Sequence, residues 1–431
     1  MKKSFSILFL IGVFMFASCN QEYLNPSAAS QTQVVNDVTG LITLANGLQY
    51  KYSISRVSPN YTLPTTGGLL SKELVVLNAG NTDEQNLMQG GASVIGNNGV
   101  ISNLWNQCNL IKSNADLILN NLGIVSDQGT KGALQAHAAI FKAMALGNLA
   151  LFWEKAPTKT QAAAPFLTRT EVLNEAIAIL EAASVELAKA PISTAFTSRI
   201  VSGIDYANTI NALIARYALM AGNYDKALAA ANLVNLAVSV KSKFTHDDLT
   251  RNALFETSFS NRNVCEPLDN KFSLPLALQT PTNDGRIAFY INPSGGTGAV
   301  NLARASFFTA NNSDLPIYRG GEVTLIKAEA YARKDDLANA TIELNKILQK
   351  TAVGDAWGIG ANLPAYSGAN IKADILTEIY KQRCIELYLT GMRLEDSRRF
   401  GRPASERGRD FLPYPFSERD NNPNTPADPA S

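Results

Sequence analysis

The sequence has few of the residues from which metal centres and acyl-transfer sites are built. Its 431 residues include four cysteines and two histidines. The cysteines have no CxxC spacing, and His137 and His246 belong to no nucleophile motif. Glycine-rich pieces such as GGASVIGNNG lack the preceding strand and following helix of a phosphate-binding loop. We therefore expect no cofactor, no metal ion and no catalytic group of these kinds.

Excess charge and a membrane-spanning run are also missing. The chain has 38 basic and 37 acidic residues, a formal net charge of +1, and no run of basic residues. Such a near-neutral chain has no electrostatic footprint for nucleic acid. No apolar run reaches the roughly 20 residues that a transmembrane helix needs.

The N-terminus instead resembles the lipobox of bacterial lipoproteins. Lys2 and Lys3 precede an apolar stretch of signal-peptide length, and small residues lead into Cys19, although Phe16 stands where leucine is usual. The resemblance implies cleavage before Cys19, acylation of that residue, and anchoring in a membrane through its lipid. The alternative is an ordinary secretory signal with a chance cysteine. The expected organisation is a signal peptide (1–18), a lipidated tether (19–35) and a single domain (36–431).

Helical periodicity dominates that domain. Apolar residues at steps of three and four predict helices near 36–55, 103–123, 130–157, 168–191 and 371–390. Two further segments, 207–236 and 321–351, each predict a helix, a tight polar turn and a second helix. Small residues stand where the paired helices must approach: Ala215, Ala227, Ala328 and Ala340. These hairpins resemble tetratricopeptide (TPR) repeats, whose apolar faces are covered by their neighbours.

Several segments interrupt the helices. Prolines and glycines predict loops at 57–68, 79–99 and 353–370, with a weak helix at 70–78 between the first two. Residues 241–318 predict an irregular insertion with a little β-structure, and the proline-rich C-terminal tail is expected to be extended. The three cysteines of the mature domain, Cys108, Cys265 and Cys384, are expected to be buried free thiols.

The densest charged segment spans residues 375–403. Arg383 and Glu386 are spaced i, i+3, and further charges crowd the turn beyond Gly391. Two interpretations are open, namely an anion or substrate site and a salt-bridge network that fixes a helical corner. We favour the network. The charges beyond the turn are Arg393, Glu395, Asp396, Arg398 and Arg399.

Three motifs together resemble the SusD/RagB family of Bacteroidetes outer-membrane lipoproteins. The first places Arg-x-x-Glu-Val before an Ala-Glu-Ala helix, the second combines Arg-x-x-Glu-Leu, Gly-x-Arg and Asp-x-x-Arg, and the third is Pro-x-Pro-x-x-Glu followed by Asn-Pro. They correspond here to Arg319, Glu322, Val323 and Ala328 to Ala330; to Arg383, Glu386, Leu387, Gly391, Arg393, Asp396 and Arg399; and to Pro413, Pro415, Glu418, Asn422 and Pro423.

The resemblance implies an all-α fold with about four TPR-like units and irregular segments that hold the ligand. It also implies a non-enzymatic protein on the outer-membrane surface. Such a protein binds an oligosaccharide or another nutrient and passes it to a SusC-like TonB-dependent transporter. Two alternatives remain: a tethered TPR module that binds only a protein partner, and a lipid-anchored glycoside hydrolase.

Ligand contacts in this family lie on variable loops that no shared motif marks. Sugar rings pack on aromatic faces, while polar side chains bond their hydroxyls. Trp105 and Trp153 lie on apolar helices and are expected in the core. The loop-borne candidates are Tyr61, Asn81, Asp83, Glu84, Tyr290, Trp357 and Tyr366.

Overall fold

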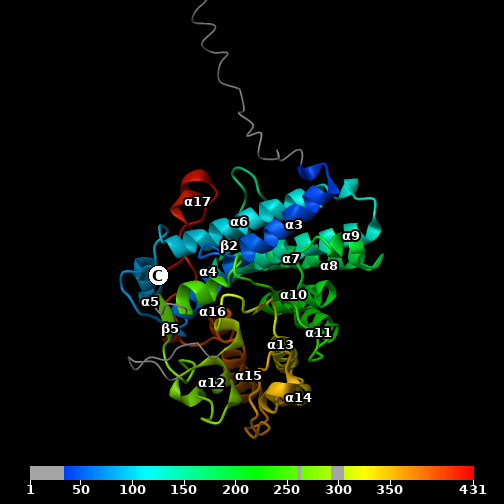
Figure 1. The fold of residues 1–431 in the computed structure, drawn as a ribbon. Coiled ribbons are helices and arrows are strands. Elements are labelled where there is room, and N and C mark those ends of the chain that lie inside the picture. Colours follow the sequence, from blue (N-terminus) through cyan, green and yellow to red (C-terminus); the bar gives the residue numbers. More distant parts are fainter. Residues whose placement is uncertain (1–33, 260–263, 293–304) are drawn as a thin grey trace, which may run out of the picture.

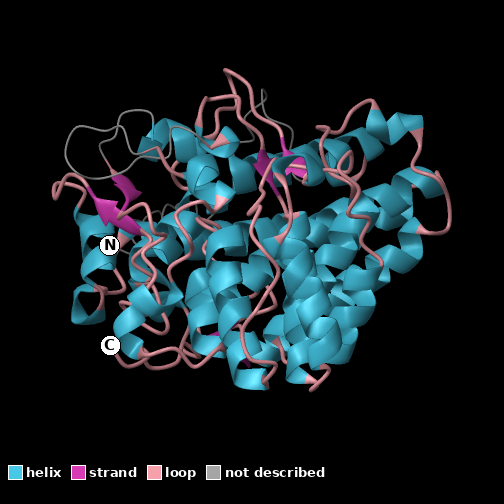
Figure 2. Cartoon of the chain, turned by 90° about the horizontal axis from the view of Figure 1, so that it is seen from below, coloured by secondary structure: helices cyan, strands magenta, loops and turns pink. Residues whose placement is uncertain are grey.

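A computed structural model describes residues 34–259, 264–292 and 305–431. The signal peptide, Cys19 and nearly all of the tether lie outside the described residues. The described part is mainly helical with three small two-stranded sheets, so the predicted all-α class with minor β-structure is confirmed (Figures 1 and 2). None of its helices is long and apolar enough to cross a membrane.

The N-terminal half is a stack of long helices. Helix α3 (Val38–Ser53) and helix α6 (Gly99–Asn120) pack together, and α7 (Gln128–Phe152) packs against both of them and against α8 (Arg169–Leu187) (Figure 1). Nearly every side chain of α7 is buried, because neighbouring helices enclose it. Side-chain caps begin these helices, including a capping box at α8 formed by Thr168 and Glu171.

Two helical hairpins extend this stack, as the sequence predicts. They are α10 (Tyr206–Met220) with α11 (Tyr224–Asn232), and α13 (Gly320–Arg333) with α14 (Leu337–Leu348). All four predicted interface alanines are fully buried, which lets the helices approach closely. Helix α8 contacts α10, α11 contacts α13, and α13 contacts α15 (Lys372–Glu386), so the units follow one another as in a solenoid.

The predictions for residues 57–89 are partly wrong. The expected loop 57–68 is largely helix α4 (Pro59–Leu70), the weak helix is strand β1 (Leu74–Val76), and α5 (Thr82–Gln89) lies within the second expected loop. Proline is tolerated at the first position of α4, where no intrahelical N–H bond is needed. Gly67 permits close contact, since a Cβ there would meet the Cα of Gly391 at 2.5 Å.

The predicted irregular insertion contains little regular structure in its described residues. Strand β4 (Lys243–Phe244) pairs with β6 (Leu315–Pro316), and β5 (Cys265–Pro267) pairs with β1, both antiparallel. The short helix α12 (Gly285–Tyr290) follows. Figure 2 shows the small strands at the edge of the helical mass. The β1–β5 pair therefore joins the insertion to the scaffold, whereas the β4–β6 pair joins the two ends of the insertion to each other.

The remaining elements are short. The C-terminal tail is not wholly extended, because it contains α17 (Phe416–Asn421), whose Glu418 accepts a hydrogen bond from Trp105 Nε1 at 3.1 Å. The indole of Trp153 donates to the carbonyl of Pro413 at 3.0 Å, and both tryptophans are in the core, as predicted. The other short elements are β2 (Lys155–Ala156) paired with β3 (Leu167–Thr168), α9 (Thr194–Thr197), α16 (Arg393–Arg399), and the single turns η1 (Gly91–Ser93), η2 (Leu122–Ile124), η3 (Phe255–Phe259), η4 (Leu276–Leu278), η5 (Ser306–Phe308), η6 (Ala352–Gly354) and η7 (Ala404–Glu406).

Candidate functional site

The charged C-terminal motif forms a buried salt-bridge network. Nε and Nη2 of Arg383 each bond one carboxylate oxygen of Asp396 at 2.9 Å. Arg399 bonds the same carboxylate and both oxygens of Glu329 on α13, each at 2.8 Å. Burial would raise the pKa of Asp396, but the two guanidiniums lower it below its usual range. The structure thus favours a network that joins α13, α15 and α16 over an open anion site.

A second part of the network encloses the predicted contact Tyr290. The carboxylate of Glu386 is paired with Arg286 at 3.4 Å and with Lys350, and it lies against Gly321, where a Cβ would overlap it. Arg319 donates to the backbone carbonyl of Glu386 at 2.8 Å and to the hydroxyl of Tyr290 at 2.6 Å. Tyr290 lies at the end of α12 and is fully buried, so the expected loop position is wrong.

A third group lies at the junction of α4 and α5. The buried carboxylate of Glu84 accepts hydrogen bonds from Tyr61 Oη at 2.9 Å and from Arg56 Nη2 at 2.5 Å. Burial is the main cause of the raised pKa of Tyr61. Asp83 is half-buried on α5, with its backbone carbonyl bonded by Asn98 at 2.8 Å, and Asn81 precedes that helix. Tyr61, Asp83 and Glu84 are therefore on helices, not on the predicted loops.

Trp357 occupies a different position, on the wall of a surface groove of about 180 Å³. Its half-buried ring packs edge-on against Phe307, with the centroids 5.4 Å apart, and Lys241 Nζ lies 4.9 Å above the ring. Oδ1 of Asp355 accepts the backbone N–H groups of Trp357 at 2.8 Å and Ile359 at 3.1 Å, which fixes this turn. We call this cavity the Trp357 groove. It is lined by Asn235, Leu236, Ala237, Val240, Lys241, Ser242, Tyr318, Gly320, Gly321, Thr324, Lys346, Ile347, Lys350, Gly354, Asp355, Ala356 and Trp357.

Among the predicted contacts, only Trp357 lines this groove. Tyr366 is half-buried on the same predicted loop, but its hydroxyl donates to the carbonyl of Ala369 at 3.1 Å, outside the groove. The groove also contains Lys241, Lys346 and Thr324, which are not among the contacts predicted from the sequence. Lys241 begins the predicted irregular insertion, and this position is the one feature of the sequence that could have marked it as a candidate contact. An aromatic wall beside amine and hydroxyl groups can bind a ring-shaped polar ligand.

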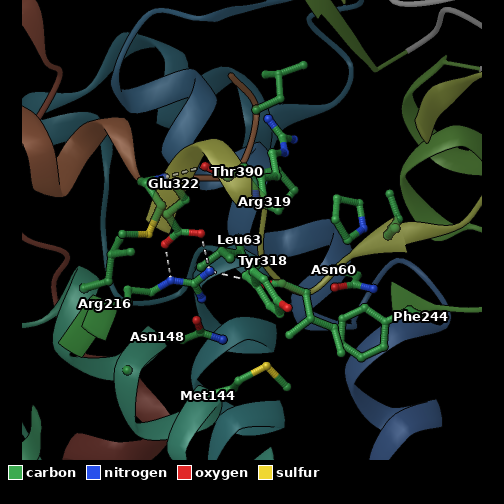
Figure 3. A pocket seen from close by; sticks show the side chains of 18 of the residues that line it. Asn60, Leu63, Met144, Asn148, Arg216, Phe244, Tyr318, Arg319, Glu322 and Thr390 are labelled. Carbon is green, nitrogen blue, oxygen red and sulfur yellow. Dashed lines mark hydrogen bonds and ion pairs between the residues drawn. The ribbon is translucent and has the colours of Figure 1, made fainter. Parts of the chain in front are cut away.

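A smaller cavity of about 100 Å³ lies between the scaffold and the insertion (Figure 3). Arg216 and Glu322 form a two-point ion pair on its wall at 2.5 and 2.7 Å. The Tyr318 hydroxyl and the Asn60 amide nitrogen, both drawn in Figure 3, have no hydrogen-bond partner among the described residues. An apolar cavity of about 150 Å³ holds one benzene molecule, so this space is too small for a sugar ring. Tyr318 lines both cavities, which therefore lie back to back.

The two histidines and the three cysteines that the structure describes line neither cavity. His137 is buried, bonds the Ala45 carbonyl at 2.9 Å and the Tyr206 hydroxyl at 3.1 Å, and has its pKa lowered to about 4 by burial. His246 is also buried, and its pKa is lowered by that burial. The three cysteines of the domain are buried and unbridged, as predicted. Within the ranges that the structure describes, no cluster of three His, Cys, Asp or Glu is placed to hold a metal ion.

Comparisons with known proteins agree with this arrangement. Residues 304–428 match the model of the SusD family. A SusD superfamily protein from Bacteroides fragilis has 16% identity and a TM-score of 0.68, with 90% of this chain and 98% of that chain covered. A SusD-like carbohydrate binding protein from Bacteroides vulgatus has 16% identity and a TM-score of 0.67, with 85% and 84% covered. A comparison with curated proteins finds no match.

The family motifs and the overall fold point to the same group of proteins. The matched segment contains all three motifs, and in the structure two of them form the network around α13, α15 and α16. The similarity in fold extends well beyond that segment, over nine tenths of the chain. The resemblance to the SusD/RagB family is therefore confirmed: residues 304–428 match its family model, and the chain has the fold of SusD superfamily proteins.

Proposed function

We propose that this protein is a surface lipoprotein that binds a carbohydrate nutrient and passes it to a SusC-like TonB-dependent transporter. The family match and the SusD-like carbohydrate binding protein among its structural neighbours support the carbohydrate. The lipobox-like N-terminus supports attachment to the outer membrane through acylated Cys19, facing the cell exterior. The transporter is the partner that the family implies. The protein itself performs no covalent chemistry on the ligand.

The observation that carries this proposal is the position of Trp357. A partly exposed indole on a groove wall offers the flat apolar surface on which the C–H face of a sugar ring can pack. Asp355 holds its backbone in place before any ligand arrives, so little ordering is needed on binding. Tyr366 on the same segment, Asn81 before α5 and Asp83 on α5 are proposed as outer contacts of a longer glycan.

The remaining predicted contacts have a different role in this proposal. Tyr61, Glu84 and Tyr290 are buried, and their polar atoms bond neighbouring protein groups. A ligand could reach them only by breaking those bonds. We assign them to the packing that supports the ligand-bearing segments.

Affinity gel electrophoresis with a panel of soluble polysaccharides tests the proposal. We expect the purified protein to be retarded by at least one of them. Trp357→Ala should weaken that binding at least tenfold, since loss of a central aromatic contact typically costs about 2 kcal/mol or more. Phe416→Ala is the matched control, because Phe416 is an exposed aromatic residue on α17, outside the groove. Circular dichroism at the assay temperature should show that both variants are folded.

Other outcomes would favour the alternatives. Equal binding by the parent protein and Trp357→Ala would show that the Trp357 groove is not the binding site. Co-purification with a β-barrel transporter, without retardation by any polysaccharide, would favour a protein-interaction module. Release of reducing sugar that stops when two specific carboxylates are replaced would contradict a non-enzymatic role.

A further inference from the structure

We propose that the Trp357 groove selects an acidic carbohydrate, one with a carboxylate or sulfate group, over a neutral one. This inference rests on the proposed function and names the ligand class of the same site. It depends on the hydrogen-bonding groups of the groove that internal contacts leave available. Among the described residues, these groups are mainly donors and cations.

Lys241 is the first of these groups. It is exposed at the edge of the insertion, and its ammonium lies 4.9 Å from the centre of the Trp357 ring. No carboxylate of the described chain forms an ion pair with it, whereas neighbouring Lys243 is paired with Asp314. A sugar that packs on this face of Trp357 takes the place of the ammonium, and an anionic group on that sugar would pair with it beside the ring. Its charge is therefore available to a ligand.

The carboxylate and amide oxygens that line the groove are already in use, whereas the Thr324 hydroxyl donates to the carbonyl of Gly320 at 3.2 Å and keeps its oxygen as one available acceptor. Asp355 is the only acidic residue among the described residues that line it, and Oδ2 of that carboxylate bonds Lys350 at 2.8 Å while Oδ1 accepts two backbone N–H groups. The Asn235 carbonyl oxygen accepts the N–H of Ala237 at 3.0 Å, which leaves the amide NH₂ available as a donor. Ser242 is engaged with Thr209 at 2.6 Å.

The charged groups buried behind the groove do not change its excess of available donors and cations over acceptors. The carboxylate of Glu386 lies behind Gly321, is fully buried, and is paired with both Arg286 and Lys350. Lys350 is divided between that carboxylate and Asp355 and so contributes no free charge. Lys346 is half-exposed and bonds Glu343 through one of its three N–H groups, which leaves two for a ligand.

The groups that remain available discriminate between neutral and acidic sugars. Hydroxyl groups of a neutral sugar both donate and accept, so they are best bound where side chains supply both kinds of partner. A carboxylate or sulfate only accepts, and its bonds to ammonium groups are stronger than neutral ones. The available side chains therefore suit an anionic ligand better.

Two matched pairs of polysaccharides test this inference. Affinity electrophoresis compares polygalacturonate with neutral galactan, and chondroitin sulfate with its desulfated, carboxyl-reduced form. We expect an acidic member to bind at least tenfold more tightly than its neutral partner, with affinity that falls as sodium chloride rises from 50 to 500 mM. Lys241→Gln should weaken acidic binding three- to tenfold, and Lys241→Arg should retain it. Lys189→Gln, at an exposed lysine of the segment after α8, is the control and should bind as the parent protein does.

The outcomes separate this inference from the proposed function. Tighter binding of a neutral polysaccharide than of its acidic partner would overturn the inference. Unchanged binding of the acidic polysaccharide by Lys241→Gln would also overturn the inference. If Trp357→Ala abolishes that binding, the proposed function would still stand. If none of the four polysaccharides nor any member of the broader panel is bound, the proposed function itself is wrong.

Discussion

Replacement of Arg383 by methionine tests whether the family motif is structural. Arg383 is 1% exposed and contributes two parallel hydrogen bonds to the equally buried Asp396. Methionine keeps most of the apolar volume while it removes the charge and the donors. The variant therefore leaves a buried carboxylate with one fewer partner and changes the packing little.

The expected loss of stability follows from what remains around Asp396. Removal of one partner of a buried ion pair typically costs about 3–5 kcal/mol. Asp396 keeps its bond from Arg399 at 2.8 Å, and Arg383 Nη1 has no hydrogen-bond partner among the described residues, so we expect about 3 kcal/mol. Unfolding entropy near 2 cal/mol/K per residue gives about 0.8 kcal/mol/K for roughly 400 residues. The midpoint of thermal unfolding should then fall by about 4 °C.

Thermal and urea unfolding followed by circular dichroism measure the effect. The control is Arg251→Met, because Arg251 and Glu256 form a pair at 3.0 Å in which both side chains are exposed by more than 40%, and such pairs contribute about 0–1 kcal/mol. Equal midpoints for the two variants would refute a structural role of the motif arginine.

Acidification gives a second check on the same pair. A carboxyl whose pKa is lowered by folding stabilises the protein above its unfolded pKa, and this contribution is lost as the pH falls towards the folded value. Arg383 and Arg399 lower the pKa of Asp396 against the effect of burial. The stability difference between the parent protein and Arg383→Met should therefore shrink below about pH 4. A difference that stays constant down to pH 3 would contradict this assignment.

Three further predictions concern buried groups elsewhere. Burial raises the pKa of Glu73 to about 7 despite Arg393, so the stability of the parent protein should fall as the pH rises from about 4.5 to 7. Glu73→Gln should abolish this dependence and be more stable than the parent protein by up to about 3 kcal/mol at pH 8 in urea unfolding. An unchanged pH dependence would exclude Glu73 as its source. Gly67→Ala should lower the free energy of unfolding by about 1–3 kcal/mol in the same assay, because its Cβ meets the backbone of Gly391. Gly123→Ala, with open space around the new Cβ, should leave it nearly unchanged. Equal losses in the two variants would contradict the close contact. Burial also raises the pKa of each domain thiol to about 12. Iodoacetamide at pH 8 should therefore label none of them in the folded protein and all of them in urea, as measured by mass spectrometry. Labelling of the folded protein would contradict their burial. These thiols are Cys108, Cys265 and Cys384.

The helical scaffold could be predicted because its signals are local. Periodic apolar residues and small interface residues such as Ala215 and Ala328 mark helical pairs without reference to distant segments. Helix α4 was missed because Pro59, Pro64 and two adjacent glycines are typical of a loop. In the folded chain, Gly67 instead permits contact with Gly391, more than 300 residues away. Packing against a distant segment overrides local propensity there.

The candidate site was harder to predict because exposure depends on partners far along the chain. Tyr61 bonds Glu84, 23 residues later, and Tyr290 bonds the backbone of Glu386, 96 residues later, so neither ring is free. Trp357 is partly exposed because the Asp355 turn holds it at the groove. Lys241 comes to the same groove from more than 100 residues upstream. No local pattern in the sequence connects these two residues.

The family motif nevertheless has a physical connection to the groove. Glu386 belongs to the motif and is buried, and its carboxylate pairs with Lys350. The same ammonium bonds Asp355 at 2.8 Å, and Asp355 in turn accepts the backbone N–H of Trp357. The motif thus fixes where the turn begins but does not determine which side chain the turn presents. The motif residues can therefore identify the fold, whereas the proposed ligand contacts depend on the three-dimensional arrangement of the loops.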